Sequence, residues 1–416
     1  MDNIIAGLDI GTSKVSAVLA KLDSNGIRIL GVGISPNNGV KKGVVVDIES
    51  TTMAVEQAVE QLKNMTNMEV DSVFINISGG HVTLYQNRGV IAVTGEDREI
   101  TGEDVRRVMQ AARIFALPPE KEIVDVIPLQ FIVDGYDEIR DPVGMFGTRL
   151  EMDAGIVACS STTLQNLIRS VERADLNIVG VVAEPLALGE VLLTKDEKEL
   201  GVLVIDVGAG KTEYSVFENG MLKNSGFIPL GGDSITNDLA VGLRISFGEA
   251  ENLKKQYGIV KQEYAGQETV PVKGIADGSQ REIGIEELCE IIEARVYEIF
   301  FLVNRELIKS GIKPKLSSGV VVTGGGVSFL KGCKEVAQEV MGLPVRIGIP
   351  EYIGVSSPVY SSGVGIVKYV TGRKHYYPGE MEGASKKTTL FGKPKTRKAQ
   401  KGGALNRLKD FLDEYF

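Results

Sequence analysis

The fold is decided by the stretch Gly201–Val216, which reads GVLVIDVGAGKTEYSV. Its near-continuous apolar run Val202–Asp206 predicts a strand that is covered on both faces. Gly208–Gly210 then predicts a tight turn with accessible backbone N–H groups. Thr212–Phe217 is rich in β-branched and aromatic residues, and Asn219-Gly220 is a strong hairpin signal. The stretch therefore predicts a strand, a glycine turn, a second strand, a hairpin and a third strand.

This order of elements excludes a Walker-type phosphate loop. The letters GAGKT resemble the end of that motif, but its first glycine would fall at Ile205. The motif also requires a helix after the lysine, whereas a strand follows Lys211. What remains is a turn whose N–H groups and lysine can hold phosphate oxygens, next to an aspartate, Asp206, that can hold a hydrated cation.

The same device occurs near the start of the chain. Ile4–Leu19 reads IIAGLDIGTSKVSAVL, and Asn25-Gly26 again predicts a hairpin. Three positions match between the two copies at a constant offset of 197: Asp9 with Asp206, Gly11 with Gly208, and Lys14 with Lys211. The repeat indicates an internally duplicated protein. Two such turns facing each other would hold a triphosphate from both sides.

Bulk composition limits the class of protein. The 416 residues exceed a single core, and 43% hydrophobic with 24% charged residues is typical of a soluble globular protein. We find no run of 18 apolar residues and no secretory signal, which predicts a cytoplasmic protein. The three cysteines have no metal-binding spacing and are expected to be buried and reduced. The two histidines argue against histidine-based metal or triad chemistry.

Four local patterns give expectations about secondary structure. Ser50–Asn67 has helical spacing with Ser50 or Thr51 as the cap. Lys195–Glu199 reads as a charged surface turn, and Val260–Ile283 as polar and rich in turns. Val327–Met341 reads as a helix that follows a third glycine turn.

The end of the chain differs in composition. Between Lys386 and Lys409 there are nine basic residues and no acidic one, whereas the net charge of the whole chain is −9. The last thirteen residues form one apolar helical face, made of Leu405, Leu408, Leu412 and Tyr415 and flanked by Phe411 and Phe416. Such a helix can insert into a lipid interface, and the basic residues favour anionic lipid. An acidic body is poorly suited to nucleic acid. The alternative is that this helix docks on the globular body.

Together these features predict an ATP–magnesium cleft between two related halves. Lys14 and Lys211 would supply point charges to phosphate, and Thr12 and Ser13 would donate hydroxyl hydrogen bonds. The acidic residues near the turns are Asp9, Glu184 and Asp206, and the third turn, Gly324–Gly326, is better suited to pack on adenosine. Each turn alone could equally be an ordinary tight turn, so the prediction depends on all three.

The order of DIGTSK, VIDVGAGKTEYSV, AEPLALGE and VVTGGG resembles the actin, Hsp70 and sugar-kinase ATPase superfamily. Within it the chain is most similar to the FtsA family of bacterial cell-division proteins, because of the segment Val126–Glu151 and the terminal amphipathic helix. The resemblance implies an α/β, actin-like duplicated ATPase fold. Two lobes would surround a nucleotide cleft, and a small α/β subdomain would be inserted in the first half.

The resemblance also implies a division of the chain. The first-lobe core would occupy 1–80 and 161–195, with the inserted subdomain at 81–160. The second-lobe core would occupy 196–230 and 311–345, with a nucleotide-flanking and partner-binding subdomain at 231–310. Residues 346–372 would return to the first lobe, 373–403 would be a flexible basic linker, and 404–416 the membrane-targeting helix.

Functional roles follow from the resemblance position by position. Phosphate would be bound by Gly11, Thr12, Ser13, Lys14, Gly208, Ala209, Gly210 and Lys211. Asp9 and Asp206 would lie near magnesium, held through water, and Glu184 would orient the attacking water. Adenosine would be held by Gly324, Gly325, Gly326 and Val327, while Glu251 and Lys254 would reach the nucleotide from the flanking subdomain.

Three positions depart from the pattern of that family. Lys211 and Glu213 stand where a hydroxyl residue and an aspartate are more usual, and Asp125 where a histidine is usual. The extra charge of Lys211 favours holding ATP, so we expect weak ATPase activity at most.

The resemblance implies a division protein that polymerises and anchors FtsZ filaments to the inner face of the cell membrane at the septum. The FtsZ C-terminal tail would dock on the flanking subdomain, where Arg295 is either a contact or a solvated helix charge. Other partners would be anionic lipid, further copies of the chain and other division proteins. The alternatives are a small-molecule kinase, or a chaperone, pilus-assembly or shape-determining ATPase of the same superfamily.

Overall fold

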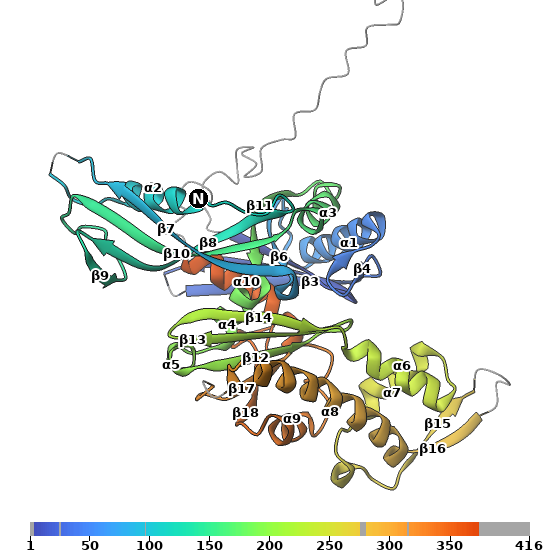
Figure 1. Ribbon diagram of the computed structural model, residues 1–416. Coiled ribbons are helices and arrows are strands. Elements are labelled where there is room, and N and C mark those ends of the chain that lie inside the picture. Colours follow the sequence, from blue (N-terminus) through green and yellow to red (C-terminus); the bar gives the residue numbers. More distant parts are fainter. Residues whose placement is uncertain (1–3, 25, 96, 275–279, 314–315, 374–416) are drawn as a thin grey trace, which may run out of the picture.

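The computed structural model describes residues 4–24, 26–95, 97–274, 280–313 and 316–373 (Figure 1). It has two lobes, each built on a five-stranded sheet, with one additional small subdomain on each lobe. The predicted linker beyond Arg373 and the predicted terminal helix lie outside the described residues. No helix in the described part of the chain is both long and apolar enough to span a membrane.

The first-lobe sheet has the strand order β11-β6-β1-β2-β3. Its strands are β1 (Ile4–Ile10), β2 (Lys14–Asp23), β3 (Gly26–Pro36), β6 (Ser72–Ile77) and β11 (Asn177–Ala183). The three strands of the predicted unit pair antiparallel, and β1, β6 and β11 pair parallel. Both β1 and β2 are buried along most of their length, because this sheet is covered on both faces.

The second-lobe sheet repeats this topology with the order β14-β13-β12-β17-β18. Its strands are β12 (Val202–Val207), β13 (Thr212–Glu218), β14 (Met221–Ile228), β17 (Val320–Thr323) and β18 (Val345–Ile347). Again the first three strands pair antiparallel, and β12, β17 and β18 pair parallel. The predicted actin-like duplicated α/β fold is therefore confirmed.

Helices of the first lobe pack on its sheet and between the two sheets. They are α1 (Ile48–Thr66), α3 (Ser161–Glu172), α4 (Glu184–Leu192) and α10 (Ser361–Gly372), together with the small hairpin β4 (Val40–Lys41) and β5 (Val44–Val45). One buried apolar cluster joins α4 and α10 to residues of both sheets, such as Val18 and Val204. This shared cluster holds the two lobes together.

A separate sheet with its own core is inserted in the first half, between β6 and β11. It has the strand order β7-β10-β8-β9 and is covered by one helix. Its elements are β7 (Val82–Ala92), α2 (Gly102–Arg113), β8 (Lys121–Val133), β9 (Tyr136–Ile139) and β10 (Arg149–Ser160). The equivalent insertion in the second half lies between β14 and β17 and contains α6 (Gly232–Leu243), α7 (Phe247–Tyr257), β15 (Thr269–Lys273), β16 (Gln280–Gly284) and α8 (Ile285–Lys309).

Two expectations about helices in the first 200 residues were wrong. The cap of α1 is Asp47, whose carboxylate accepts a hydrogen bond of 3.1 Å from the Ser50 N–H. The predicted turn at 195–199 is a short helix, α5 (Lys195–Leu200), because Thr194 and Glu197 form a capping box across its first turn.

Two expectations in the second half were also wrong. The polar segment 260–283 contains the β15–β16 hairpin, in which Val270 and Val272 alternate with exposed residues and face the core. Helix α9 (Cys333–Met341) begins six residues later than predicted. The preceding segment instead forms a bridge between Lys331 and Ile259, and Gly332 takes a left-handed conformation.

The long helix α8 offers a direct test of the second-lobe core. Phe300 is fully buried, whereas its neighbour Phe301 is 46% exposed. We expect Phe300→Ala to destabilise the protein by about 3–5 kcal/mol, because it removes a buried ring and leaves a cavity. Urea unfolding should show an earlier midpoint for this variant. Phe301→Ala is the matched control, and equal losses for both variants would contradict the assigned core.

Candidate functional site

The cleft between the lobes contains a cavity of about 760 Å³, within the usual range for ligand sites. Its lining comes from both sheets and from the second-lobe insertion. The predicted residues that it brings together are Asp9, Gly11–Lys14, Glu184, Asp206, Gly208–Lys211, Glu251, Lys254 and Gly324–Gly326. Residues more than 300 positions apart in the sequence thus surround one space.

The two glycine turns have the same geometry and touch each other. The Gly11 N–H donates to the Lys14 carbonyl at 2.9 Å, and the Gly208 N–H donates to the Lys211 carbonyl at 3.0 Å. A methyl group at Gly210 would lie 2.9 Å from Cγ2 of Thr12, so the tips of the turns are in contact across the cleft. This close approach requires a glycine at position 210 and places the two turns side by side.

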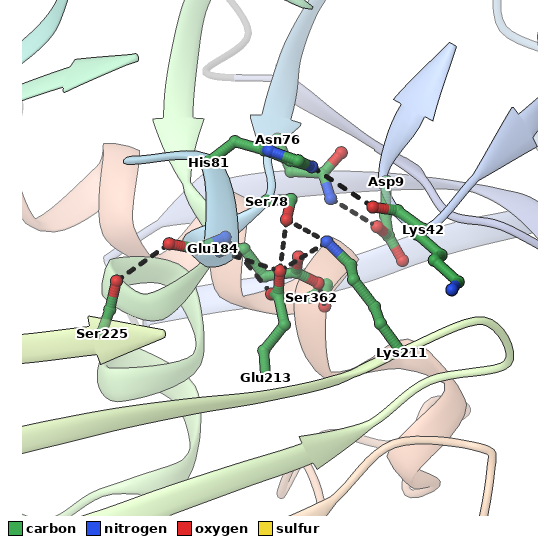
Figure 2. Close-up of polar contacts among 12 residues, drawn as sticks. Asp9, Lys42, Asn76, Ser78, His81, Glu184, Lys211, Glu213, Ser225 and Ser362 are labelled. Atoms are coloured by element: carbon green, nitrogen blue, oxygen red, sulfur yellow. Dashed lines mark hydrogen bonds and ion pairs between the residues drawn. The ribbon is translucent and has the colours of Figure 1, made fainter. Parts of the chain in front are cut away.

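Asp9 and Asp206 are the residues before the last in the equivalent strands β1 and β12. The Asn76 amide donates to the Asp9 carboxylate at 2.7 Å, as Figure 2 shows. Burial raises the pKa of Asp9 and, with the nearby charges of Glu213 and Asp9, raises the pKa of Asp206 to about 7. Among the described residues, no group of three or more Asp, Glu, His or Cys side chains could hold a metal by itself. Two aspartates do fit a magnesium ion that keeps its waters and binds phosphate oxygens.

The two predicted phosphate lysines differ in their surroundings. Lys14 Nζ donates to the Val359 carbonyl, and burial lowers its pKa against the opposing effect of nearby acids. Lys211 Nζ donates to Glu213 at 2.5 Å and also to Ser78. The charge that Lys211 adds next to the second glycine turn is therefore paired with Glu213.

Glu184 begins α4 and is almost fully buried at the edge of the cavity. The Ser362 hydroxyl donates to its carboxyl group at 2.8 Å. Burial, reinforced by the charges of Glu213, Asp206 and Asp9, raises the pKa of Glu184 well above its usual value. The raised pKa favours the neutral form of this carboxyl group, which can both donate and accept hydrogen bonds.

The third turn packs closely against the second phosphate turn. Gly324 has φ of +90°, and a methyl group there would lie 2.1 Å from Oδ1 of Asp206. Gly324, Gly325 and Gly326 line the cavity, but Val327 does not. Val327 is 1% exposed within the second-lobe core, so its predicted role in holding adenosine was wrong.

Glu251 and Lys254 form a polar cluster that lines the cavity from α7 of the second-lobe insertion. Lys254 Nζ lies 2.7 Å from both the Glu251 carboxylate and the Thr236 hydroxyl, and 2.9 Å from the Gly232 carbonyl. Burial alone would raise the pKa of Glu251, but hydrogen bonds from Lys254 and Thr236 lower it. The cluster therefore presents a fixed ion pair to the cavity.

Sequence reasoning missed several lining residues. They are Asn76, Ser78, Asp233, Phe329, Val359 and Ser362. The sequence did contain a signal for Ser78. This residue lies between an apolar strand and Gly79-Gly80, and in both predicted phosphate turns an apolar strand is likewise followed by glycines. The others come from elements whose place beside the cleft is set only by packing.

Arg295 lies on α8 and does not line the cavity. Its guanidinium donates to Asp238 at 2.6 and 3.1 Å and also to Glu298. The side chain is one quarter exposed, so one face of this ion-paired group meets solvent. The three cysteines are all buried, as expected.

Asp206 generates a prediction about pH. An acid whose native pKa is raised contributes stability at low pH that is lost as the pH rises through that pKa. In protein free of metal and nucleotide, we expect the melting temperature of Asp206→Asn to rise relative to wild type between about pH 4 and 7. Thermal melts across this range measure it, with the exposed Asp196→Asn as control. A difference that stays constant with pH would contradict the raised pKa.

Two family models match the chain. Residues 203–365 match the model described as cell division protein FtsA, and residues 79–158 match the SHS2 domain inserted in FtsA. The second match covers the inserted sheet β7–β10 and its helix. The cell division protein FtsA of Bacillus subtilis is 42% identical over 369 residues, or 88% of this chain and 83% of that protein. The FtsA of Pseudomonas aeruginosa is 36% identical over an alignment that covers 88% of this chain and 89% of that protein.

Solved structures share the fold at low sequence identity. A chain of the PilM–PilN type IV pilus biogenesis complex superposes with a TM-score of 0.59 at 17% identity, covering 88% of this chain and 98% of its own. MreB5 of Spiroplasma citri bound to ADP superposes with a TM-score of 0.54 at 14% identity, covering 91% of this chain and 98% of its own. These similarities show an actin-like fold.

Proposed function

Because the chain belongs to the FtsA family of cell-division proteins, we propose that it binds ATP and magnesium, polymerises, and anchors FtsZ filaments to the cytoplasmic membrane. The main support for ATP binding is that three glycine turns and two aspartates line one cavity between the lobes. The ADP-bound MreB5 structure, which has the same fold, supports it. Membership in a division family decides against a small-molecule kinase.

Each part of the cavity suits one part of ATP. The contacting turns at Gly11–Lys14 and Gly208–Lys211 would hold the phosphates through backbone N–H groups and Lys14. Asp9 and Asp206 would hold magnesium through its waters, and the metal would neutralise charge between these carboxylates and the phosphates. Gly324–Gly326 leaves room for adenosine beside the apolar Phe329 and the Glu251–Lys254 pair.

Glu184 is the residue that we propose to orient the attacking water. Burial and the neighbouring acids Glu213, Asp206 and Asp9 raise the pKa of its carboxyl group. It can orient a water molecule through its hydrogen bonds, with Ser362 fixing its position. We propose that hydrolysis of ATP at this site is weak at most.

Lys14 provides the test of nucleotide binding. In Lys14→Met we expect the affinity for magnesium-ATP to fall about 10- to 100-fold, since a charge-assisted hydrogen bond contributes about 1.5–3 kcal/mol. Isothermal titration calorimetry measures the change. Lys21→Met, on the same strand but away from the cavity, is the control. Unchanged affinity in Lys14→Met would contradict the assigned phosphate site.

The proposed membrane and filament contacts use other residues than the proposed nucleotide site. The apolar residues Leu405, Leu408, Phe411, Leu412, Tyr415 and Phe416 are suited to insertion in the lipid interface at the inner face of the membrane, aided by the basic residues before them. Arg295 on α8 donates hydrogen bonds to Asp238 and Glu298, which fix its side chain. Its guanidinium group is suited to bind an acidic group of the FtsZ tail. The described helices contain no membrane span, which is compatible with a peripheral attachment.

A vesicle assay separates these two contacts. With vesicles containing anionic lipid and fluorescent FtsZ, we expect the full chain to bring filaments to the membrane. Removal of residues 404–416 should abolish membrane binding, whereas Arg295→Ala should keep membrane binding and lose filament recruitment.

Lys334→Ala, which changes an exposed residue on another helix of the same lobe, is the control for Arg295. Membrane binding by the truncated chain would contradict the anchor, and full recruitment by Arg295→Ala would remove that residue from the FtsZ contact.

A further inference from the structure

A carboxylate of the second lobe is held by a turn of the first lobe (Figure 2). Glu213 lies on β13, and its partners lie at the end of β6 and in the short helix η1 (Gly79–His81). The Ser78 hydroxyl and the backbone N–H groups of Gly79 and Gly80, at 3.2 and 3.0 Å, all donate to it. Three donors from one lobe thus bind a single carboxylate from the other, and we call this contact the Glu213 seat.

The first-lobe turn fits closely against its surroundings. A methyl group at Gly79 would lie 2.5 Å from Pro185, and one at Gly80 would lie 2.6 Å from Phe227 of β14. The Ser225 hydroxyl donates to the Gly79 carbonyl at 2.9 Å. Backbone and side-chain contacts therefore hold the same turn, and only glycines fit there.

Lys211 takes part in the same contact. Its ammonium group donates to Glu213 at 2.5 Å and to Ser78, and the side chain is only 10% exposed. A methyl group at Gly43 would lie 2.3 Å from Nζ, so the tip of the β4–β5 hairpin covers it from the first lobe. Burial alone would raise the pKa of Glu213, but the charge of Lys211 and the hydrogen bonds lower it to about 2.

Lys211 and Glu213 nevertheless line the cavity. The Lys211 backbone closes the second phosphate turn, so phosphates held by that turn would lie near its side chain. A shift of this ammonium group toward bound phosphate would lengthen its contacts with Glu213 and Ser78.

We propose that Glu213 is an interlobe positioning residue, which seats β13 on the first-lobe turn and competes with bound triphosphate for the Lys211 ammonium group. This inference rests on the proposed binding of ATP for its second half only. It assigns a role to both departures from the family pattern, Lys211 and Glu213, as one compensated pair. By thermodynamic reciprocity, phosphate that draws Lys211 away from Glu213 must loosen the seat by the same free energy.

Calorimetry with magnesium-ATP tests the competition. Glu213→Gln keeps the shape and acceptor oxygen of the seat but removes the charge, so Lys211 becomes more available. We expect Glu213→Gln to raise the affinity for magnesium-ATP about tenfold. In a protein that already carries Lys211→Met, adding Glu213→Gln should leave that affinity unchanged. Glu218→Gln, at the outer end of β13, is the control. A loss of affinity in Glu213→Gln, or the same change in both backgrounds, would overturn the competition.

Interlobe distances without nucleotide test the seat by itself. Spin labels attached at Glu56→Cys on α1 and Lys334→Cys on α9 measure the distance between the first and the second lobe. The native cysteines are buried. We expect a narrow distance distribution that Glu213→Ala broadens and Glu213→Gln preserves. An unchanged distribution in Glu213→Ala would overturn the seat. If calorimetry finds no ATP binding at all, the proposed nucleotide site fails, while the label distances still decide whether Glu213 positions the lobes.

Discussion

The structure depends on one constraint, the close packing of two homologous sheets against the shared helices α4 and α10. Their buried side chains form a single apolar cluster with residues of both sheets, including Val18 and Val204. This cluster sets the separation of the lobes. Because each phosphate turn directly follows the first strand of its sheet, the same packing brings Thr12 against Gly210. The cavity is therefore a consequence of how the duplicated halves pack.

Charge balance is the second organising feature of the cleft. The cavity is lined by the acids Asp9, Glu184, Asp206 and Glu213, and by the lysines Lys14, Lys211, Lys254 and Lys255. Burial raises the pKa of Glu184 and raises that of Asp206 to about 7, while the charge of Lys211 and hydrogen bonds lower the pKa of Glu213 to about 2. The pKa values of acids in one cavity thus shift in different directions because their neighbours differ. A cation together with phosphate would complete this balance.

The Lys211–Glu213 pair illustrates how a departure from a family pattern can be compensated. Read alone, a lysine in the second turn suggests stronger phosphate binding. In the structure its charge is shared with an acid two residues later and with a serine of the other lobe. The two substitutions therefore act through one contact, and neither can be interpreted without the other.

What the sequence by itself determined is mainly local and repeated. The two copies of strand, turn and strand, with Asp9 and Asp206 at a constant offset, were sufficient for the duplicated fold and for the two glycine turns that meet in the cavity. They were sufficient because glycine turns and strand periodicity depend on neighbouring residues. Tertiary structure alone decided the partner of Lys211, since Ser78 lies 133 positions away in the sequence. It also decided the burial of Val327 in the second-lobe core, because the segment that contains it does not form the first turns of the predicted helix and instead makes a bridge between Lys331 and Ile259.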